Sequence, residues 1–454
     1  MPPVAAPPLV IGLAVAFALG VLAGAVVNWA VYWLAYRRRA ISPWSPPPAG
    51  APPRRVADRL PVLGWIGLRR ERALHGAGFW IRPLVVELLL GASWAAMYWW
   101  EVDRQGLIVR QVEALLVGPL PIGVPAAPFA LLLATFVAHA LLIGLMAAAS
   151  LIDIDEKTIP DSVTLPGTLL ALALATVSPA SLLPHVDVRF APPDVGTPLQ
   201  LPLPPAVQAA GGVAYLEPLS LVAPNQWPES LQGAPNWRSL VIGLGCYAVW
   251  IFALTPRIWR GRRGVGVGLS VMSARVARSL MRRPLAPLAL VGVAAITAVW
   301  GYGGGPWLGL LTALVGMVGG GGLVWAVRIV GSAAMRREAM GFGDVTLMMM
   351  IGAFLGWQPS VLNFFIAPFA GLVVGVLQLI LRRDDVIPYG PFLCLGALAV
   401  MIRWADFWNA ESSVRAMFEW PWLVPAVMAV GVVLLGAMLV IWRNIKEAIF
   451  RREA

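Results

Sequence analysis

The stretch PFALLLATFVAHALLIGLMAAASLI, residues 128–152, contains no charged side chain and is followed directly by Asp153. About 20 consecutive apolar residues are enough for a helix to cross the hydrocarbon core of a bilayer. Comparable runs recur along the whole 454-residue chain, which is 59% hydrophobic and only 13% charged. An average soluble protein is about 25% charged. The sequence therefore predicts an all-α polytopic integral membrane protein.

Ten or eleven of these runs are expected to form membrane-spanning helices. Three candidates, at 162–180, 344–357 and 388–403, are short or interrupted by Gly and Pro. The full set of candidate spans is 9–35, 82–100, 128–152, 162–180, 238–255, 285–302, 306–330, 344–357, 361–381, 388–403 and 421–442.

Arginine clusters predict how the chain is oriented. They follow the first, fifth, seventh, ninth and last candidate spans. With eleven spans and an extracytoplasmic N-terminus, all of them and the C-terminus lie in the cytoplasm, as the positive-inside rule requires. The first basic residue is Arg37, so we expect the first apolar run to be a retained helix rather than a cleaved signal peptide.

The formal net charge of +11 indicates contact with anionic lipid headgroups of the bilayer. No nucleic-acid motif is present, and we expect no nucleic-acid partner. Cys246 and Cys394 lie far apart in apolar runs and are predicted to be packing residues. The three histidines fall in different segments, so we expect no metal site built on histidine.

The chain divides into four predicted regions. Residues 1–100 form an N-terminal membrane region with a Pro-rich cytoplasmic loop at 36–81, and 101–180 form a second membrane region. Residues 181–237 are a Pro-rich, weakly charged extracytoplasmic insertion, in which a small β-rich excursion is one option. Residues 238–454 form the remaining membrane region.

Two acidic clusters lie at predicted cytoplasmic ends of spans. The first, SLIDIDEKTIPD (150–161), closes the third span, and the second, REAMGFGDVTL (337–347), opens the eighth. Acidic residues at membrane spans are rare and tend to be functional. The predicted topology puts Asp153 and Asp344 on the same face at similar depth, so their carboxyl groups could meet.

Two neighbouring carboxyls in a partly desolvated site share one proton, because both do not ionise easily. The ionised group can deprotonate a water, and the protonated group can protonate a leaving nitrogen. Gly341 and Gly343 would let a substrate backbone approach and would permit a positive φ before the helix. A structural interpretation is also open, in which Asp344 and Asp161 are helix N-caps and Asp153 is an interfacial charge.

Taken together, these residues resemble the bacterial prepilin peptidases (type IV leader peptidases), a branch of the Gly-x-Gly-Asp intramembrane aspartyl proteases. The first motif of that family is matched by LID (151–153) and IPD (159–161). The second is matched by EAMGFGD (338–344), and a third, a Pro-Phe-Gly-Pro-Phe type turn, by IPYGPF (387–392). The resemblance implies a Gly-x-Gly-Asp protease-like helix bundle in which Asp153 and Asp344 are the catalytic pair. Other motif residues are expected to support the site: Gly341, Gly343, Asp155, Asp161, Glu338 and Pro160.

The N-terminal region resembles the family less closely. Gly24, Asn28, LPVLGW (60–65), Arg82-Pro83-Leu84 and Glu87 fit its pattern, but the four cysteines of the family's cytoplasmic loop are missing. Without thiolates no tetrahedral zinc site can form there, so zinc is not expected. Proteolysis by this family needs no cofactor, and S-adenosylmethionine would be one only if the N-methyltransferase activity of bifunctional members is retained. Thr346 also stands where the family often has Lys, which indicates a divergent member.

The resemblance implies a protease of the bacterial inner membrane that cleaves the leaders of prepilin-like or pseudopilin precursors for a type IV pilus or type II secretion system. Acidic residues such as Glu156 and Glu338 could steer a basic leader. The alternatives are a polytopic transporter, against which no paired repeats are present, and a non-catalytic scaffold of such an assembly. The precursor, the cleavage dipeptide and the oligomeric state stay open.

Overall fold

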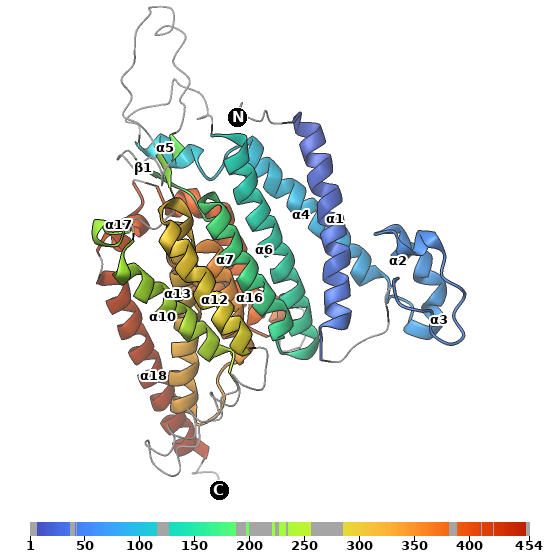
Figure 1. Cartoon of the computed structure of the whole chain (residues 1–454). Helices are drawn as coiled ribbons and strands as arrows, with labels where there is room; N and C mark the ends of the chain where they lie inside the picture. The colour runs from blue at the N-terminus through green and yellow to red at the C-terminus, as the bar shows by residue number, and fades with distance from the viewer. Residues whose placement is uncertain are drawn as a thin grey trace, which may run out of the picture.

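The computed structural model describes residues 7–36, 41, 43–115, 127–187, 197–198, 220–222, 227–232, 235–255, 285–380, 388–409, 411–420 and 422–450. Long helices lie side by side as a bundle (Figure 1). The predicted all-α polytopic membrane fold is confirmed. Much of the basic sequence that predicts the orientation, at 37–39, 257–283, 382–383 and 451–452, lies outside the described residues, so the placement of the two termini stays a prediction.

Eight of the described helices are long and apolar enough to cross a membrane. They are α1 (Leu9–Trp33), α4 (Ile81–Tyr98, continued by the π-helical turn η3, Trp99–Asp103), α6 (Phe129–Glu156), α12 (Leu285–Tyr302), α13 (Gly304–Met335), α15 (Trp357–Ile380), α16 (Gly390–Phe407) and α18 (Leu423–Phe450). Three shorter apolar helices are α7 (Asp161–Val177), α10 (Trp237–Ala253) and α14 (Phe342–Leu355). All eleven fall on the runs that the sequence marks as candidate spans. Of the three weakest candidates, 162–180 and 344–357 form the short helices, whereas 388–403 forms the longer α16.

Small residues let the helices approach closely. A methyl group added at Gly24 of α1 would lie 2.5 Å from the Cα atom of Glu87 in α4. Gly316 of α13 and Gly352 of α14 each lie directly against the other's backbone carbonyl. Lipid tails are as apolar as the side chains, so helices in a bilayer associate largely through such close van der Waals packing.

Helix α14 is enclosed by its neighbours α7, α13, α15 and α16. All of its residues from Asp344 to Leu355 are buried. The helix ends at Gly356, whose φ of +94° lets the chain reverse directly into α15. The bundle therefore fixes the start of α14, where the second acidic motif lies, from several sides.

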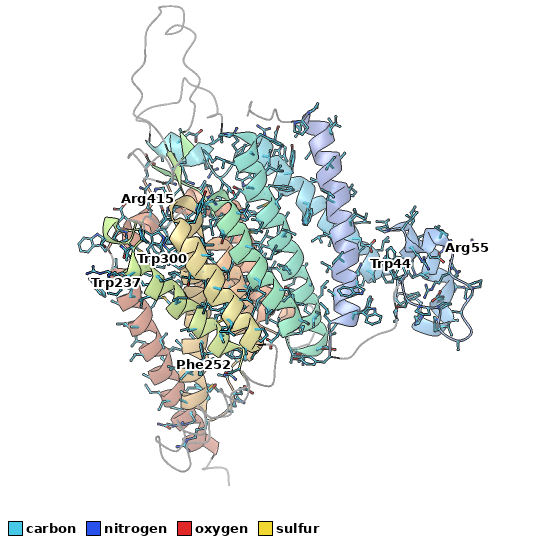
Figure 2. All side chains as sticks on the ribbon, in the orientation of Figure 1. Trp44, Arg55, Trp237, Phe252, Trp300 and Arg415 are labelled. Carbon is cyan, nitrogen blue, oxygen red and sulfur yellow. The ribbon has the colours of Figure 1, made fainter. Side chains whose placement is uncertain are left out.

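The N-terminal loop forms a small unit beside the bundle, with the exposed residues Trp44 and Arg55 on it (Figure 2). It consists of η1 (Val56–Arg59), α2 (Leu63–Leu68), η2 (Arg69–Glu71) and α3 (Arg72–His75). The buried carboxylate of Glu87 in α4 anchors it. This carboxylate accepts hydrogen bonds from the Val62 backbone N–H at 2.5 Å, the Trp65 indole at 2.8 Å and the Asn28 amide of α1 at 3.2 Å.

Two buried carboxylates hold the interior of this unit through ion pairs. Asp58 is 2% exposed and both of its oxygens accept hydrogen bonds from Arg70, one of them at 2.9 Å. Glu71 forms an ion pair with Arg54 at 3.1 Å, and Nε2 of His75 lies 3.5 Å from its other carboxylate oxygen. The unit therefore folds around charge pairs and contains no thiol.

Only parts of the insertion at 181–237 are described. Strands β1 (His185–Asp187), β2 (Thr197–Pro198) and β3 (Ser220–Val222) pair antiparallel in the order β1-β3-β2. A helix of one turn, α9 (Glu229–Gln232), precedes α10. The described residues thus include a small β excursion, and most of the insertion lies outside them.

The Asp58–Arg70 pair predicts how acid affects the N-terminal unit. The hydrogen-bonded Arg70 guanidinium holds the pKa of Asp58 below its usual range. A carboxyl with a lowered folded-state pKa stabilises the fold above its unfolded-state pKa, and this contribution is lost as the pH falls through the lowered value. Protection of residues 43–80 from proteolysis should therefore fall on acidification below about pH 4.

An Arg70→Gln variant should lose this protection even at neutral pH, with local stability lower by on the order of 3 kcal/mol, because it leaves a buried carboxylate unpaired. Limited proteolysis read by mass spectrometry measures the effect. The exposed Arg59 of the same unit supplies the matched control, Arg59→Gln, which should digest like the parent. Equal digestion of both variants would show that the ion pair is not what holds the unit.

Candidate active site

Asp153 lies in the last turn of α6, with a side chain that is only 3% exposed. Lys157 ends the helix by taking a left-handed backbone conformation, φ 55°, and its N–H bonds to the Asp153 carbonyl at 2.7 Å. The chain then passes through the buried residues Ile159 and Pro160 into α7. Asp153 is therefore a buried group on a rigid helix and not an exposed interfacial charge.

Asp344 lies in the first turn of α14 and is 8% exposed. Gly341 is the N-cap residue, and no side chain caps the helix. The interpretation of Asp344 as an N-cap is therefore wrong. A negative charge in this turn is still favoured by the partial positive charge of the helix N-terminus, by about 0.3–1 kcal/mol.

Ile159 brings the three sequence motifs together. A methyl group added at Gly343 would lie 2.9 Å from Cβ of Ile159, and one added at Gly390 would lie 2.9 Å from its Cδ1. The group added at Gly390 would also lie 2.5 Å from Oδ2 of Asp153. The starts of α14 and α16 thus both meet the turn between α6 and α7. Asp153 and Asp344 lie close enough for their charges to interact.

The carboxyl group of Asp153 is only partly satisfied by hydrogen bonds. The backbone N–H of Gly390 donates to it, while its Oδ2 atom has no hydrogen-bond partner among the described residues. A buried polar atom without a partner costs about 1–3 kcal/mol, and native structures contain few of them. This oxygen therefore has hydrogen-bonding capacity that no described residue uses.

The two motif glycines do different things. The expectation of a positive φ before the helix is wrong, because Gly341 has φ −62° and Gly343 lies within the helix. At Gly343 the backbone that approaches closely belongs to this chain and not to a substrate, since an added methyl group would lie 3.0 Å from the Ile159 nitrogen. At the exposed Gly341 the nearest atom would be Oδ2 of Asp344, at 3.5 Å. Room for another backbone beside Asp344 is therefore at Gly341.

Asp155 and Glu156 tie other helices to the end of α6. Asp155 accepts hydrogen bonds from Arg82 of α4 at 2.7 and 3.0 Å, and Glu156 accepts one from the backbone N–H of Tyr36 at 2.8 Å. These contacts hold α4 and the end of α1 against the residues next to Asp153.

The other predicted supporting residues lie around the turn and the loop. Pro160 is the N-cap residue of α7, so Asp161, which is exposed, is the first helical residue and not the predicted N-cap. Glu338 is exposed and pairs with Arg328 of α13. Arg328 also donates from Nε to the Met340 carbonyl at 2.9 Å, which fixes the loop just before Gly341.

Two residues of α16 reach the site although the sequence assigned neither to it. Gly390 belongs to the third motif, so its place in that turn was the available signal. Cys394 follows one helical turn later, hydrogen-bonds with Ser150, and lies close enough to both carboxyls for their charges to act on it. It was predicted only to pack. Within the described residues, no group of three or more His, Cys, Asp or Glu side chains could hold a metal ion.

Residues 277–376, which contain α12, α13, α14 and Asp344, match the model of the type IV leader peptidase family. This stretch of the chain is similar to that family. It lies in a multi-pass membrane protein, and it contains the complete second motif. Asp153 and the third motif lie outside the match to the family model. They are linked to the matched second motif by the contacts of Gly343 and Gly390 with Ile159.

Curated proteins are similar to about a fifth of the chain. The prepilin leader peptidase/N-methyltransferase of Pseudomonas putida is 35% identical over 106 residues, which is 22% of this chain and 36% of the relative. The protein of that name from Pseudomonas aeruginosa is 32% identical over 114 residues, 22% of this chain and 39% of the relative. The matched part thus spans little more than a third of these relatives. No solved structure matches the chain.

The two glycines predict opposite responses to alanine. Gly343→Ala should destabilise the protein by about 1–3 kcal/mol, because the methyl group is forced into the backbone of Ile159. Gly341→Ala adds a methyl group with only an ordinary contact and should change stability by less than about 1 kcal/mol. Thermal unfolding in detergent, followed by size-exclusion chromatography, compares the two variants with the parent. A larger loss from Gly341→Ala would contradict this geometry.

Proposed function

We propose that this chain is a membrane aspartyl endopeptidase that removes N-terminal leaders from prepilin-like or pseudopilin precursors. The observation that carries the proposal is the meeting of three distant motifs at Ile159, which brings the buried groups Asp153 and Asp344 within reach of each other's charge. Proteins similar to part of this chain are named prepilin leader peptidase/N-methyltransferase, which supports the choice of substrate class.

The proposed chemistry is general acid–base catalysis by the carboxyl pair. Asp153 and Asp344 share one proton, because two like charges in a desolvated site are unfavourable. The ionised carboxyl removes a proton from the attacking water. The protonated carboxyl hydrogen-bonds the scissile carbonyl and then protonates the departing nitrogen. Because the pair titrates as a unit, the two roles belong to the pair and are not divided between the residues.

The surroundings of the pair supply orientation for this reaction. The Gly390 N–H holds one carboxyl in place, and Oδ2 of Asp153 keeps its capacity to accept a hydrogen bond. The free side of Gly341 is the proposed path of the substrate backbone beside Asp344. Holding the reacting groups in one geometry lowers the entropic part of the barrier.

The position of the pair suits a substrate with a polar leader and an apolar helix. Asp153 lies at the end of α6 and Asp344 at the start of α14, so both are at helix ends rather than at mid-membrane. A precursor whose apolar helix lies in the bilayer would present its leader junction at this level. We place this face in the cytoplasm, because the positive-inside rule assigns the arginine-rich loops to that side.

The proposal is confined to proteolysis. The family match covers residues 277–376 and not the N-terminal region that resembles the loop of bifunctional members. In that region the buried carboxylate of Glu87 accepts three hydrogen bonds that join the loop to α1 and α4, a role that holds the fold together.

The test is leader cleavage in proteoliposomes that contain the purified protein and a prepilin-like precursor. Asp153→Asn and Asp344→Asn should each lower the cleavage rate by on the order of 10³-fold, because each removes one half of the acid–base pair. Mass spectrometry of the released leader measures the rate.

Asp155→Asn is the matched control, since Asp155 lies two residues from Asp153 but its carboxylate is engaged by Arg82. It should keep cleavage within about tenfold of the parent. If both site variants cleave like the parent, the carboxyl pair does not catalyse the reaction. If the parent itself leaves every precursor intact while the protein is folded, the fold serves as a non-catalytic scaffold and the proposal fails.

A further inference from the structure

The N-terminal unit beside the bundle keeps its acids inside and presents arginine outside. Residues 43–80 contain two acidic side chains, Asp58 and Glu71, and both are buried in ion pairs with Arg70 and Arg54. The remaining arginines of these residues are all exposed: Arg55, Arg59, Arg69 and Arg72. Figure 2 places Arg55 on the side of the unit that points away from the bundle. Within residues 43–80 the outer surface is therefore positively charged, with no exposed carboxylate to offset it.

Helix α2 of this unit has apolar side chains on two opposite faces. Trp65 and Leu68 are buried in a cluster with Tyr32 of α1. Leu63 and Ile66 lie on the other side of the helix, because 3.6 residues make one turn, and Leu63 is 58% exposed. Other exposed apolar side chains of the unit are Trp44, Val56, Leu60 and Leu74. Exposed arginine combined with exposed leucine and tryptophan is typical of segments that lie in a membrane interface.

The unit lies at the level of the helix ends and not beyond them. Its Val62 N–H and Trp65 indole bind Glu87, which follows the first residue of α4 by six positions and so lies about 9 Å inside that helix. The Trp65 ring also lies beside that of Tyr32, with centroids 6.3 Å apart, in the last turn of α1. Figure 1 shows α2 and α3 to the side of the lower part of α1.

This level corresponds to the lipid headgroups. Helix α1 has 25 residues and is therefore about 37 Å long, whereas the hydrocarbon core of a bilayer is about 30 Å thick. The last turn of α1 thus reaches the headgroup region, and a unit that lies beside this turn has lipid as its neighbour. An acidic soluble partner would match the arginines but would leave the apolar face of α2 without a contact.

We propose that residues 43–80 form a membrane-surface module. Its exposed arginines bind the phosphate groups of anionic phospholipids around α1 and α4, and the face of α2 that carries Leu63 and Ile66 contacts the boundary between headgroups and acyl chains. The guanidinium group suits this ligand because it binds phosphate through two parallel hydrogen bonds. The inference concerns lipid binding and does not depend on the proposed proteolysis.

The experiment reconstitutes the full-length protein in nanodiscs of phosphatidylcholine and in nanodiscs of an equimolar mixture of phosphatidylcholine and phosphatidylglycerol. Hydrogen exchange of residues 55–75, read by mass spectrometry, should be about tenfold slower in the anionic nanodiscs, since each arginine near an anionic surface strengthens the contact about fivefold. Added salt should reduce this difference, because exposed charges are screened. Equal exchange of the parent in the two nanodiscs would overturn the proposal.

Two exposed arginines supply the variants for this experiment. Arg69→Gln combined with Arg72→Gln should remove most of the difference between the nanodiscs, whereas Arg69→Lys combined with Arg72→Lys should keep it, because the charge is kept. Arg238→Gln changes an exposed arginine at the start of α10 and is the matched control, which should behave like the parent. If the glutamine pair exchanges like the parent in both nanodiscs, the arginines do not bind the lipid.

A fluorophore attached to Leu63→Cys tests the apolar face. A nitroxide-labelled lipid in the anionic nanodiscs should quench it more strongly than it quenches the parent labelled in the same way, whose own thiols are Cys246 and Cys394. Equal quenching would place this face of α2 in water and would contradict the proposal. Protection that is the same in both lipid mixtures, and that rises only when a nanodisc holds two copies, would make the surface a contact between copies and would also overturn it.

Discussion

The removal of two carboxyl groups from water is the constraint on which the rest of this structure depends. Taking a single charge into a medium as apolar as a membrane interior is costly, and two like charges close together are worse. The chain meets this constraint by placing Asp344 in the first turn of a helix, where backbone N–H groups are available, and Asp153 where it receives an N–H from a neighbouring helix. Asp344 lies at the positive end of α14, and Asp153 receives the N–H that opens α16. The backbone N–H groups at helix N-termini thus stabilise the two carboxyl groups, as water would in a soluble enzyme.

Holding that arrangement requires rigid helices at close range. The start of α14 meets Ile159 without a side chain at Gly343, and its far half meets α13 through Gly316 and Gly352. From the other side, Arg82 and the backbone of Tyr36 bind the last carboxylates of α6. The aspartates therefore lie between two groups of helices, each fixed by contacts that tolerate little added volume.

Much of this could be predicted from the sequence. The apolar runs located every described candidate span, because a helix that crosses the bilayer needs about 20 consecutive residues without charge, and such a run is easy to recognise. The two acidic motifs could also be recognised, and the structure brings them together at Ile159, whereas the membrane face on which they lie stays a prediction. What failed was local backbone geometry: neither Gly341 nor Gly343 takes a positive φ, and Gly341 and Pro160 occupy the N-cap positions expected for Asp344 and Asp161. Caps depend on where a helix starts to within one residue, and spacing alone does not fix that.

The residues that α16 contributes to the site were harder to predict from the sequence. Gly390 and Cys394 lie more than two hundred residues after Asp153, and no periodicity relates them to it. Only the packing of α16 on α6 brings them there. The resemblance of IPYGPF to a family turn marked the segment, but a turn motif by itself does not state which carboxyl it touches.

The charge pairs in the N-terminal unit have a wider consequence. A loop closed by thiolates and metal would respond to oxidants, chelators and copper, all of which act on sulfur. The unit formed around Asp58 and Glu71 has no sulfur in its cysteine-free interior for those agents to attack. Because its carboxylates are buried, salt screens them little, whereas acid can protonate them. The chain has thereby exchanged dependence on the redox state and metal supply of its surroundings for dependence on their acidity.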